Sequence, residues 1–184
     1  MQDYILEICA DSAESAIAAE KGGATRLELC QNLIIGGTTP GPKLFEIVRH
    51  AVEIPVHVLI RPRFGDFCYS DYEMEQIKEE IKMFRELGAD GVVIGVLSPD
   101  GSIDRERMER LLEERGGMSV TLHRAFDVCR DPLKSLQTAK DLGIQTILTS
   151  GQKDSCMEGA DLLRELQKES QGGIQIQAGG GVTP

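Results

Sequence analysis

The sequence predicts an α/β protein, a TIM-type (β/α)8 barrel that is incomplete, with about seven strands and without the C-terminal β/α portion. Short runs rich in β-branched residues alternate regularly with longer amphipathic stretches, which is typical of repeated βα units. Glycines stand where the amphipathic stretches end, as expected of helix C-termini. Polar residues also recur at every second position of several predicted strands.

Each predicted element follows from this alternation. The predicted strands cover residues 4–9, 26–30, 56–61, 91–96, 119–124, 146–150 and 174–178. The predicted helices cover residues 12–21, 43–51, 71–87, 104–114, 132–142 and 156–168. No linker or change of composition interrupts residues 1–184, so we expect a single barrel domain. A closed barrel has eight strands, so we expect a fragment, a natural truncation or half of a shared assembly.

The two-residue period favours a barrel over an open sheet. In residues 4–9, Glu7 and Cys9 share one face, whereas Leu6 and Ile8 share the other. Later strands repeat this separation, with Glu28 and Cys30, His57 and Arg61, Thr121 and His123, and Gln175 and Gln177 on the polar face. An open parallel sheet is covered by helices on both faces and needs two apolar faces. We therefore expect the polar face to point into a barrel and the apolar face to pack against the helices.

Charge and composition exclude several classes of partner. The net charge of -10 repels nucleic acid and anionic lipid. No apolar run is long enough for a membrane helix, and the first residues lack the features of a signal peptide. Five cysteines without zinc-module spacing indicate reduced thiols. We therefore expect a cytoplasmic protein with no nucleic-acid or membrane partner.

All five cysteines lie at or after strand ends, where ligands bind in such barrels. Cys9 and Cys30 end the first two strands, which lie about 4.8 Å apart if they are neighbours. At equal heights the two sulfurs could bind one soft metal ion such as Cu(I). The alternative is that small cysteine side chains simply fill the mouth of the barrel.

The segment from Arg61 to Asp71 is rich in groups that recognise ligands. Arg61 and Arg63 could bind a carboxylate or phosphate, with Asp66 orienting them. The alternative for Arg61 is an ion pair with Glu7 or Glu28 inside the barrel. We expect such a network there and expect Arg63 to remain available for a ligand.

His123 is the best candidate for an acid or base, because it ends a strand on the polar face. Glu28 and Asp127 are its candidate catalytic partners, and we expect these groups to converge on one axis. A histidine that is merely hydrogen-bonded in the core is the alternative.

Glycine-rich segments follow the sixth and seventh strands and could bind an anion through backbone amides. Ser150, Gly151 and Gly180 are the candidate residues for this site. The glycines could instead serve only to turn the backbone.

Several ordered segments together resemble the CutC family over the whole chain. They are residues 6–9, 26–30, 36–40, 60–63, 65–67, 91–95, 123–127, 148–151 and 179–184. The resemblance implies a TIM-type barrel, a cytoplasmic location, self-association and a link to copper tolerance. It also implies that Cys9 and Cys30 hold Cu(I). Departing from the family, the chain ends before an eighth strand.

Two functions therefore remain open at this point, together with a scaffold that needs no ligand. The first is a copper homeostasis protein that binds Cu(I) at the mouth of the barrel. The alternative is an enzyme that acts on a small anionic or sugar-like metabolite.

Overall fold

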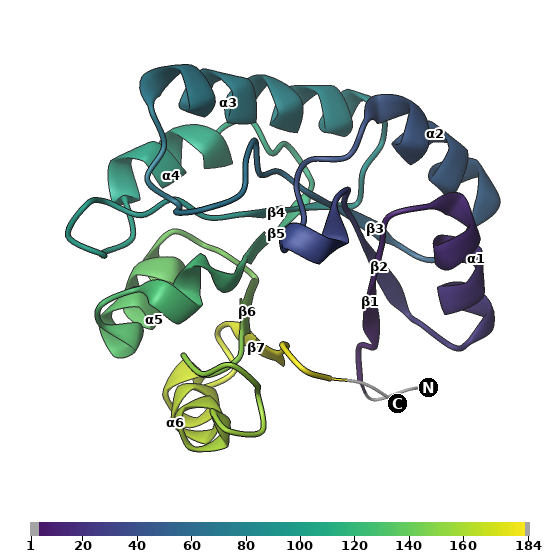
Figure 1. Ribbon diagram of the computed structural model, residues 1–184. Coiled ribbons are helices and arrows are strands. Elements are labelled where there is room, and N and C mark those ends of the chain that lie inside the picture. The colour runs from purple at the N-terminus through teal and green to yellow at the C-terminus, as the bar shows by residue number, and fades with distance from the viewer. Residues whose placement is uncertain (1–3, 183–184) are drawn as a thin grey trace. The chain divides into compact units, whose positions relative to one another are not determined.

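The computed structural model describes residues 4–182, and strands alternate with helices throughout (Figure 1). The strands are β1 (Glu7–Ala10), β2 (Arg26–Leu29), β3 (Val56–Leu59), β4 (Gly91–Ile94), β5 (Ser119–Leu122), β6 (Thr146–Thr149) and β7 (Gln175–Ala178). The α-helices are α1 (Ala13–Lys21), α2 (Pro42–Ala51), α3 (Asp71–Glu86), α4 (Arg105–Leu112), α5 (Pro132–Asp141) and α6 (Ala160–Ser170). Two 3-10 helices, η1 (Leu33–Ile35) and η2 (Arg124–Val128), follow β2 and β5. Every strand and helix predicted from the sequence is present.

The strands form one sheet in the order β1 to β7, which is the sequential order expected of repeated βα units. The pairing between neighbours is parallel, as for β1 with β2 and β6 with β7. The register places Cys9 opposite Glu28, and Glu28 opposite His57. One polar residue from each of three adjacent strands therefore lies at the same level.

The chain groups into two compact units. Unit 1 comprises residues 4–65, 72–93 and 114–118, and unit 2 comprises residues 66–71, 94–113 and 119–182. In unit 1, α1 packs against β1, β2 and α2. In unit 2, α6 packs against β7 and α5, while η2 packs against β6. The prediction of a single domain stays a prediction.

Aromatic and aliphatic side chains fill the core of unit 1. Phe45 of α2 and Phe84 of α3 are both fully buried, and their rings meet edge to face with centroids 5.5 Å apart. Leu27 and Leu29 of β2 are buried as well. This contact holds two helices together and supports the strands that carry the polar residues.

The helix starts follow from local hydrogen bonds. Ser12 caps α1, because its hydroxyl accepts the Ser15 amide at 3.1 Å while the Ser15 hydroxyl accepts the Ser12 amide at 3.2 Å. Asp131 caps α5 by accepting the amide of Lys134 at 3.0 Å. These caps set the point where each loop becomes a helix.

Several bounds differ from the expectations, as for β1, which begins at Glu7 rather than at residue 4. Helix α6 begins at Ala160 rather than at residue 156, because the amide of Cys156 donates to Gly180 O at 2.9 Å instead of entering a helix. Ile8, expected to pack under helices, is 38% exposed. Strand β1 has one neighbour in the strand order, so its apolar face is covered less completely than that of an inner strand.

Among the residues that the structure describes, no helix has the length and apolar character needed to cross a membrane.

The ring contact yields a test of the unit 1 core. Replacing Phe84 by alanine removes a fully buried ring and leaves a cavity, so we expect unfolding free energy to fall by about 3–5 kcal/mol. Urea unfolding followed by circular dichroism measures this change. Phe64→Ala is the matched control, because Phe64 is 65% exposed and should change stability by less than about 0.5 kcal/mol. Equal losses for both variants would contradict the proposed core.

Candidate functional site

A row of polar side chains begins at the buried ends of β1 and β2. Glu7 accepts a hydrogen bond from Arg26 Nε at 2.5 Å, and both side chains are at most 10% exposed. An ion pair of Arg61 with Glu7 or Glu28 was expected here, and the residue that the structure pairs with Glu7 is Arg26. The register explains this pair, because Arg26 lies directly opposite Glu7. Arg26 lies on the same face of β2 as Glu28, two residues earlier, and this spacing could have identified it as the partner of Glu7.

Glu28 is the next residue in this row and is an unusual carboxyl group. Its residue is only 6% exposed, and its Oε2 has no hydrogen-bond partner within residues 4–182. Burial raises the pKa of Glu28 to about 8 and nearby Glu7 adds to this shift, while Arg26 opposes it. At neutral pH, Glu28 is therefore mainly protonated and can donate a hydrogen bond.

His57 lies opposite Glu28 on β3 and is 4% exposed. Burial lowers the pKa of His57 to about 4, Arg26 lowers it further, and Asp90 opposes both. His57 is therefore neutral at pH 7. A neutral acid thus faces a neutral imidazole across two neighbouring strands.

Cys9 and Cys30 both lie near Glu28, but they are at different heights along the strands. Cys9 is opposite Glu28, and Cys30 lies two residues beyond Glu28, about 6.6 Å further along the strand direction. They retain the same parity, so both thiols belong to the polar face. The Cys30 thiol donates to Ala10 O at 3.6 Å.

The two thiols are protonated at neutral pH. Burial raises the pKa of Cys30 to about 12, with Glu28 and Asp11 contributing in the same direction. The pKa of Cys9 is raised by burial and then by Glu28, Cys30 and Glu7.

The two arginines predicted to bind anions already have partners in unit 1. Arg61 is buried and donates from Nη1 to Gly36 O and Gly37 O, each at 3.1 Å, and from Nη2 to Gly65 O at 3.1 Å. Arg63, expected to be available for a ligand, is paired through Nε with Glu73 at 2.5 Å. Arg61 therefore joins two loops, and Arg63 secures its loop to α3.

The candidate residues of unit 2 surround the end of β5. His123 is 4% exposed, and its Nδ1 accepts the amide of Ala125 at 3.2 Å, which places the ring proton on Nε2. The ring of Phe67 lies 4.8 Å from the imidazole. Gly95 leaves room for the imidazole, because a Cβ at this position would lie 2.7 Å from it. His123 is thus held in one orientation and one tautomer.

Asp127 organises the loop after β6. Its Oδ1 accepts the hydroxyl of Thr149 and the amide of Ser150, and its Oδ2 accepts Arg124 Nε at 2.7 Å. The amide of Gln152 donates to Oδ1 at 3.3 Å. With both oxygens engaged, Asp127 is better suited to positioning this loop than to proton transfer.

The other predicted residues of unit 2 are engaged to different extents. The amide of Gly151 donates to Thr149 Oγ1 at 2.9 Å, and the amide of Ser150 donates to Asp127. Asp66 accepts the amide of Cys68 at 2.9 Å and so shapes its own turn. Gly180 lies beside the guanidinium group of Arg124. Arg124 was not among the anion ligands predicted from the sequence. Its position next to His123 was the available signal.

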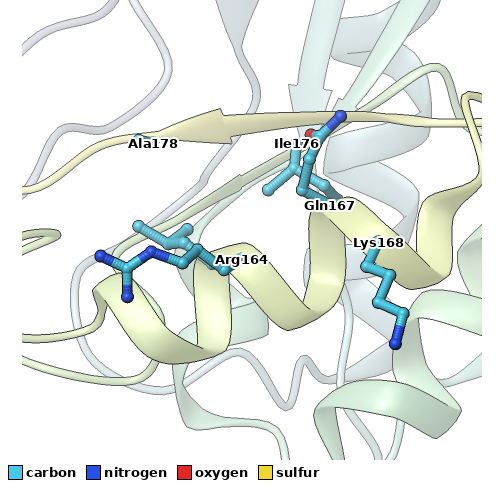
Figure 2. A pocket seen from close by; sticks show the side chains of 6 residues that line it. Arg164, Gln167, Lys168, Ile176 and Ala178 are labelled. Carbon is cyan, nitrogen blue, oxygen red and sulfur yellow. The ribbon is translucent and has the colours of Figure 1, made fainter.

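A shallow groove of about 450 Å³ lies between α6 and β7, on the helix-facing side of the strand (Figure 2). It is lined by Leu163, Arg164, Gln167, Lys168, Ile176 and Ala178. Ile176 thus faces a helix, as the two-residue period predicts. The candidate site residues do not line this groove.

The separate groups of residues differ in the chemistry that they can support. Within residues 4–182, no cluster of three or more His, Cys, Asp or Glu side chains has the arrangement of a metal site. Cys9 and Cys30 still provide two soft donors, which is a set suited to Cu(I). The predicted convergence of Glu28, His123 and Asp127 on one axis stays a prediction.

Comparison with known proteins decides the family. A model described as the CutC family matches residues 4–184. The chain belongs to the CutC family. A copper homeostasis protein cutC homolog of Mus musculus is 46% identical over 98% of this chain, which spans 66% of that protein. A CutC family protein of Bacteroides fragilis is 48% identical over 99% of this chain and 73% of its own length.

Solved structures confirm the fold of this CutC family member. A copper homeostasis protein CutC from Streptococcus agalactiae matches with a TM-score of 0.92 and 36% identity, covering 98% of this chain and 90% of that chain. An aldolase named QR15 matches with a TM-score of 0.70 at 15% identity, over 99% of this chain and 83% of its own, and shows the fold alone. The predicted TIM-type α/β fold, with seven strands in residues 4–182, is therefore confirmed.

Glu28 gives this CutC chain a specific dependence of stability on pH. Between its ordinary pKa of 4.5 and about 8, the unfolded state is ionised while the folded state keeps the proton, so stability falls as pH rises. His57 has the opposite effect, but only below its ordinary pKa of 6.5. Between pH 6.5 and 8, we expect the wild type to lose stability relative to Glu28→Gln, by up to about tenfold in the unfolding constant per pH unit.

Urea unfolding at several pH values measures this difference. The exposed Glu165 provides the matched control, since Glu165→Gln removes the same charge from helix α6. Parallel stability curves for Glu28→Gln and wild type would show that Glu28 is ionised in the folded protein.

Proposed function

We propose that this chain serves copper homeostasis by binding Cu(I) through the thiolates of Cys9 and Cys30. The observation that carries the proposal is that both cysteines share the polar face of two adjacent parallel strands, with Cys9 opposite Glu28 and Cys30 two residues beyond it. Two thiolates form a soft donor set that suits Cu(I). The link to copper is supported by the names of the relatives from Mus musculus and Streptococcus agalactiae, both of which are copper homeostasis proteins by name.

The register has a consequence for how the ion would be bound. Since the two cysteines are offset along the strands, their side chains must turn toward each other, and the Cys30 thiol must give up its contact with Ala10 O. Each thiol also has to lose its proton. Affinity should therefore rise with pH over the range in which the thiols remain protonated.

We further propose a cytoplasmic location and self-association. A reducing compartment would keep Cys9 and Cys30 available as thiols, and both are free cysteines here. The apolar side chains of Ile34, 97% exposed, and Ile8 offer surface that a second copy could cover.

A titration of reduced protein with Cu(I) in the presence of a competing chelator tests the copper function. We expect one strong site per chain, with affinity reduced by at least about a hundredfold in a Cys9→Ser, Cys30→Ser variant because thiolate ligands are lost. The variant Cys129→Ser, Cys156→Ser is the matched control and should bind like the wild type. Unchanged affinity in the first variant would exclude the proposed site.

A second candidate function is an enzyme that acts on a small anionic or sugar-like metabolite. The observation that favours it is the fixed orientation of His123, whose Nδ1 accepts the Ala125 amide while Gly95 and Phe67 enclose the ring. Such a histidine presents Nε2–H as a proton donor.

A metabolite screen by thermal shift tests this second function. We expect a hit whose stabilisation persists in the Cys9→Ser, Cys30→Ser variant and is reduced in His123→Asn, because binding would use the imidazole and not the thiols. Asparagine retains an acceptor for the Ala125 amide, so the loop should keep its structure. A hit that is unaffected by His123→Asn and abolished by the serine pair would instead support copper-linked binding.

A further inference from the structure

Arg124, at the start of η2, has a guanidinium group that is held in place but still partly accessible. Its Nε donates to Asp127 Oδ2 at 2.7 Å, and its Nη2 donates to Ser150 Oγ at 3.0 Å. The side chain is 44% exposed, and no acceptor within residues 4–182 binds Nη1. Two hydrogen bonds therefore orient the planar group, while one edge remains available to a ligand.

The loop after β7 lies directly beside this guanidinium. A Cβ built on Gly180 would lie 3.3 Å from Arg124 Cζ, 3.4 Å from Nη1 and 3.1 Å from Ser150 Cβ. Gly180 also has a φ of +92°, which favours glycine. The absence of a side chain thus lets the backbone approach the arginine.

Further contacts hold this loop in position. The carbonyl of Gly180 accepts the amide of Cys156 at 2.9 Å, and the amide of Gly179 donates to Thr149 O at 3.0 Å. By contrast, within the described part of the chain the amides of Gly180 and Gly181 donate to no protein acceptor. Two backbone donors of the loop that packs beside Arg124 therefore have no acceptor in this part of the chain.

The charge of Arg124 is only partly neutralised. Asp127 is its ionic partner, with a side chain only 8% exposed, but this carboxylate also accepts hydrogen bonds from Thr149, Ser150 and Gln152. The negative charge is thus shared among several donors. Asp127 contacts Nε, so an anion at Nη1 would meet the guanidinium without displacing it.

We propose that Arg124 Nη1 and the backbone amides of Gly180 and Gly181 bind one oxyanion group, a carboxylate or a phosphate, of a small ligand. The site replaces Arg61 and Arg63 as the anion anchor, because those two arginines are engaged by carbonyls and by Glu73. The proposal rests on the second candidate function and deepens it by naming the charged group of the substrate. Arginine with neighbouring backbone amides is a chemically suitable set for either oxyanion.

Calorimetric titration of the 184-residue chain with inorganic phosphate and, separately, with malonate tests the site and distinguishes the two anions. We expect saturable binding of at least one probe, with a Kd on the order of 1 mM. Arg124→Gln should weaken binding about tenfold or more, since a charge-assisted hydrogen bond is lost. Arg124→Lys keeps the charge without the planar group and should fall between the two.

Arg130→Gln is the matched control, because Arg130 is an exposed arginine of the same unit that pairs with Asp100. It should bind either probe within about twofold of wild type. Gly180→Ala places a methyl group against Arg124 and should weaken binding without removing any charge. Circular dichroism and urea unfolding of each variant show whether a loss of binding accompanies a loss of fold.

The possible outcomes distinguish a failure of this anion site from a failure of the proposed functions. Equal binding by Arg124→Gln and wild type, or no saturable binding of either probe to wild type, would overturn the site. Binding that depends on Arg124 supports it even if the metabolite screen finds no substrate, in which case only the enzymatic function fails. Cu(I) affinity should be the same in Arg124→Gln and wild type, so the copper function is tested independently.

Discussion

The parallel pairing of β1, β2 and β3 is the constraint on which the chemistry of unit 1 depends. It places Cys9, Glu28 and His57 at one level and brings Arg26 opposite Glu7. A shift of one residue in β2 would turn Glu28 and Cys30 toward the helices and leave Leu27 and Leu29 on the polar face. The apolar contacts of those two leucines, both fully buried, therefore fix the position of the polar row.

In unit 2, a buried carboxylate has the corresponding role. Asp127 joins η2 to the loop after β6 through Thr149, Ser150 and Gln152. Gln152 has a left-handed backbone with φ 59°, and its side chain donates to Cys129 O at 2.7 Å. The cost of that conformation is offset by hydrogen bonds made on both sides of the residue. A rigid loop results, and it is this loop that holds Ser150 against Arg124.

The fold could be predicted from the sequence because hydrophobic periodicity and glycine positions depend on local structure. Within residues 4–182 every β-strand and α-helix was predicted, although the two 3-10 helices were not, and Glu28 and His57 share one face of the sheet as expected. Side-chain partners could not be predicted in the same way. Arg61 binds three backbone carbonyls and Arg63 binds Glu73, because loop conformation decides which acceptor an arginine can reach. The two-residue period also does not determine the register between strands. The register places Cys9 level with Glu28 and therefore two residues short of Cys30.

Two glycines at the base of the loop after β6 have a consequence for its variation. A Cβ on Gly151 would lie 2.3 Å from the carbonyl oxygen of Gly159, and a Cβ on Gly159 would lie 1.9 Å from that of Ser150. The backbone segments at Gly151 and Gly159 are in contact, so no larger residue fits at either position. Residues 152–158 thus form a loop whose ends keep their spacing, and its side chains can vary where they take no part in the contacts of Gln152 and Cys156. Related proteins could differ in this loop and still preserve the geometry of the strand end from which it starts.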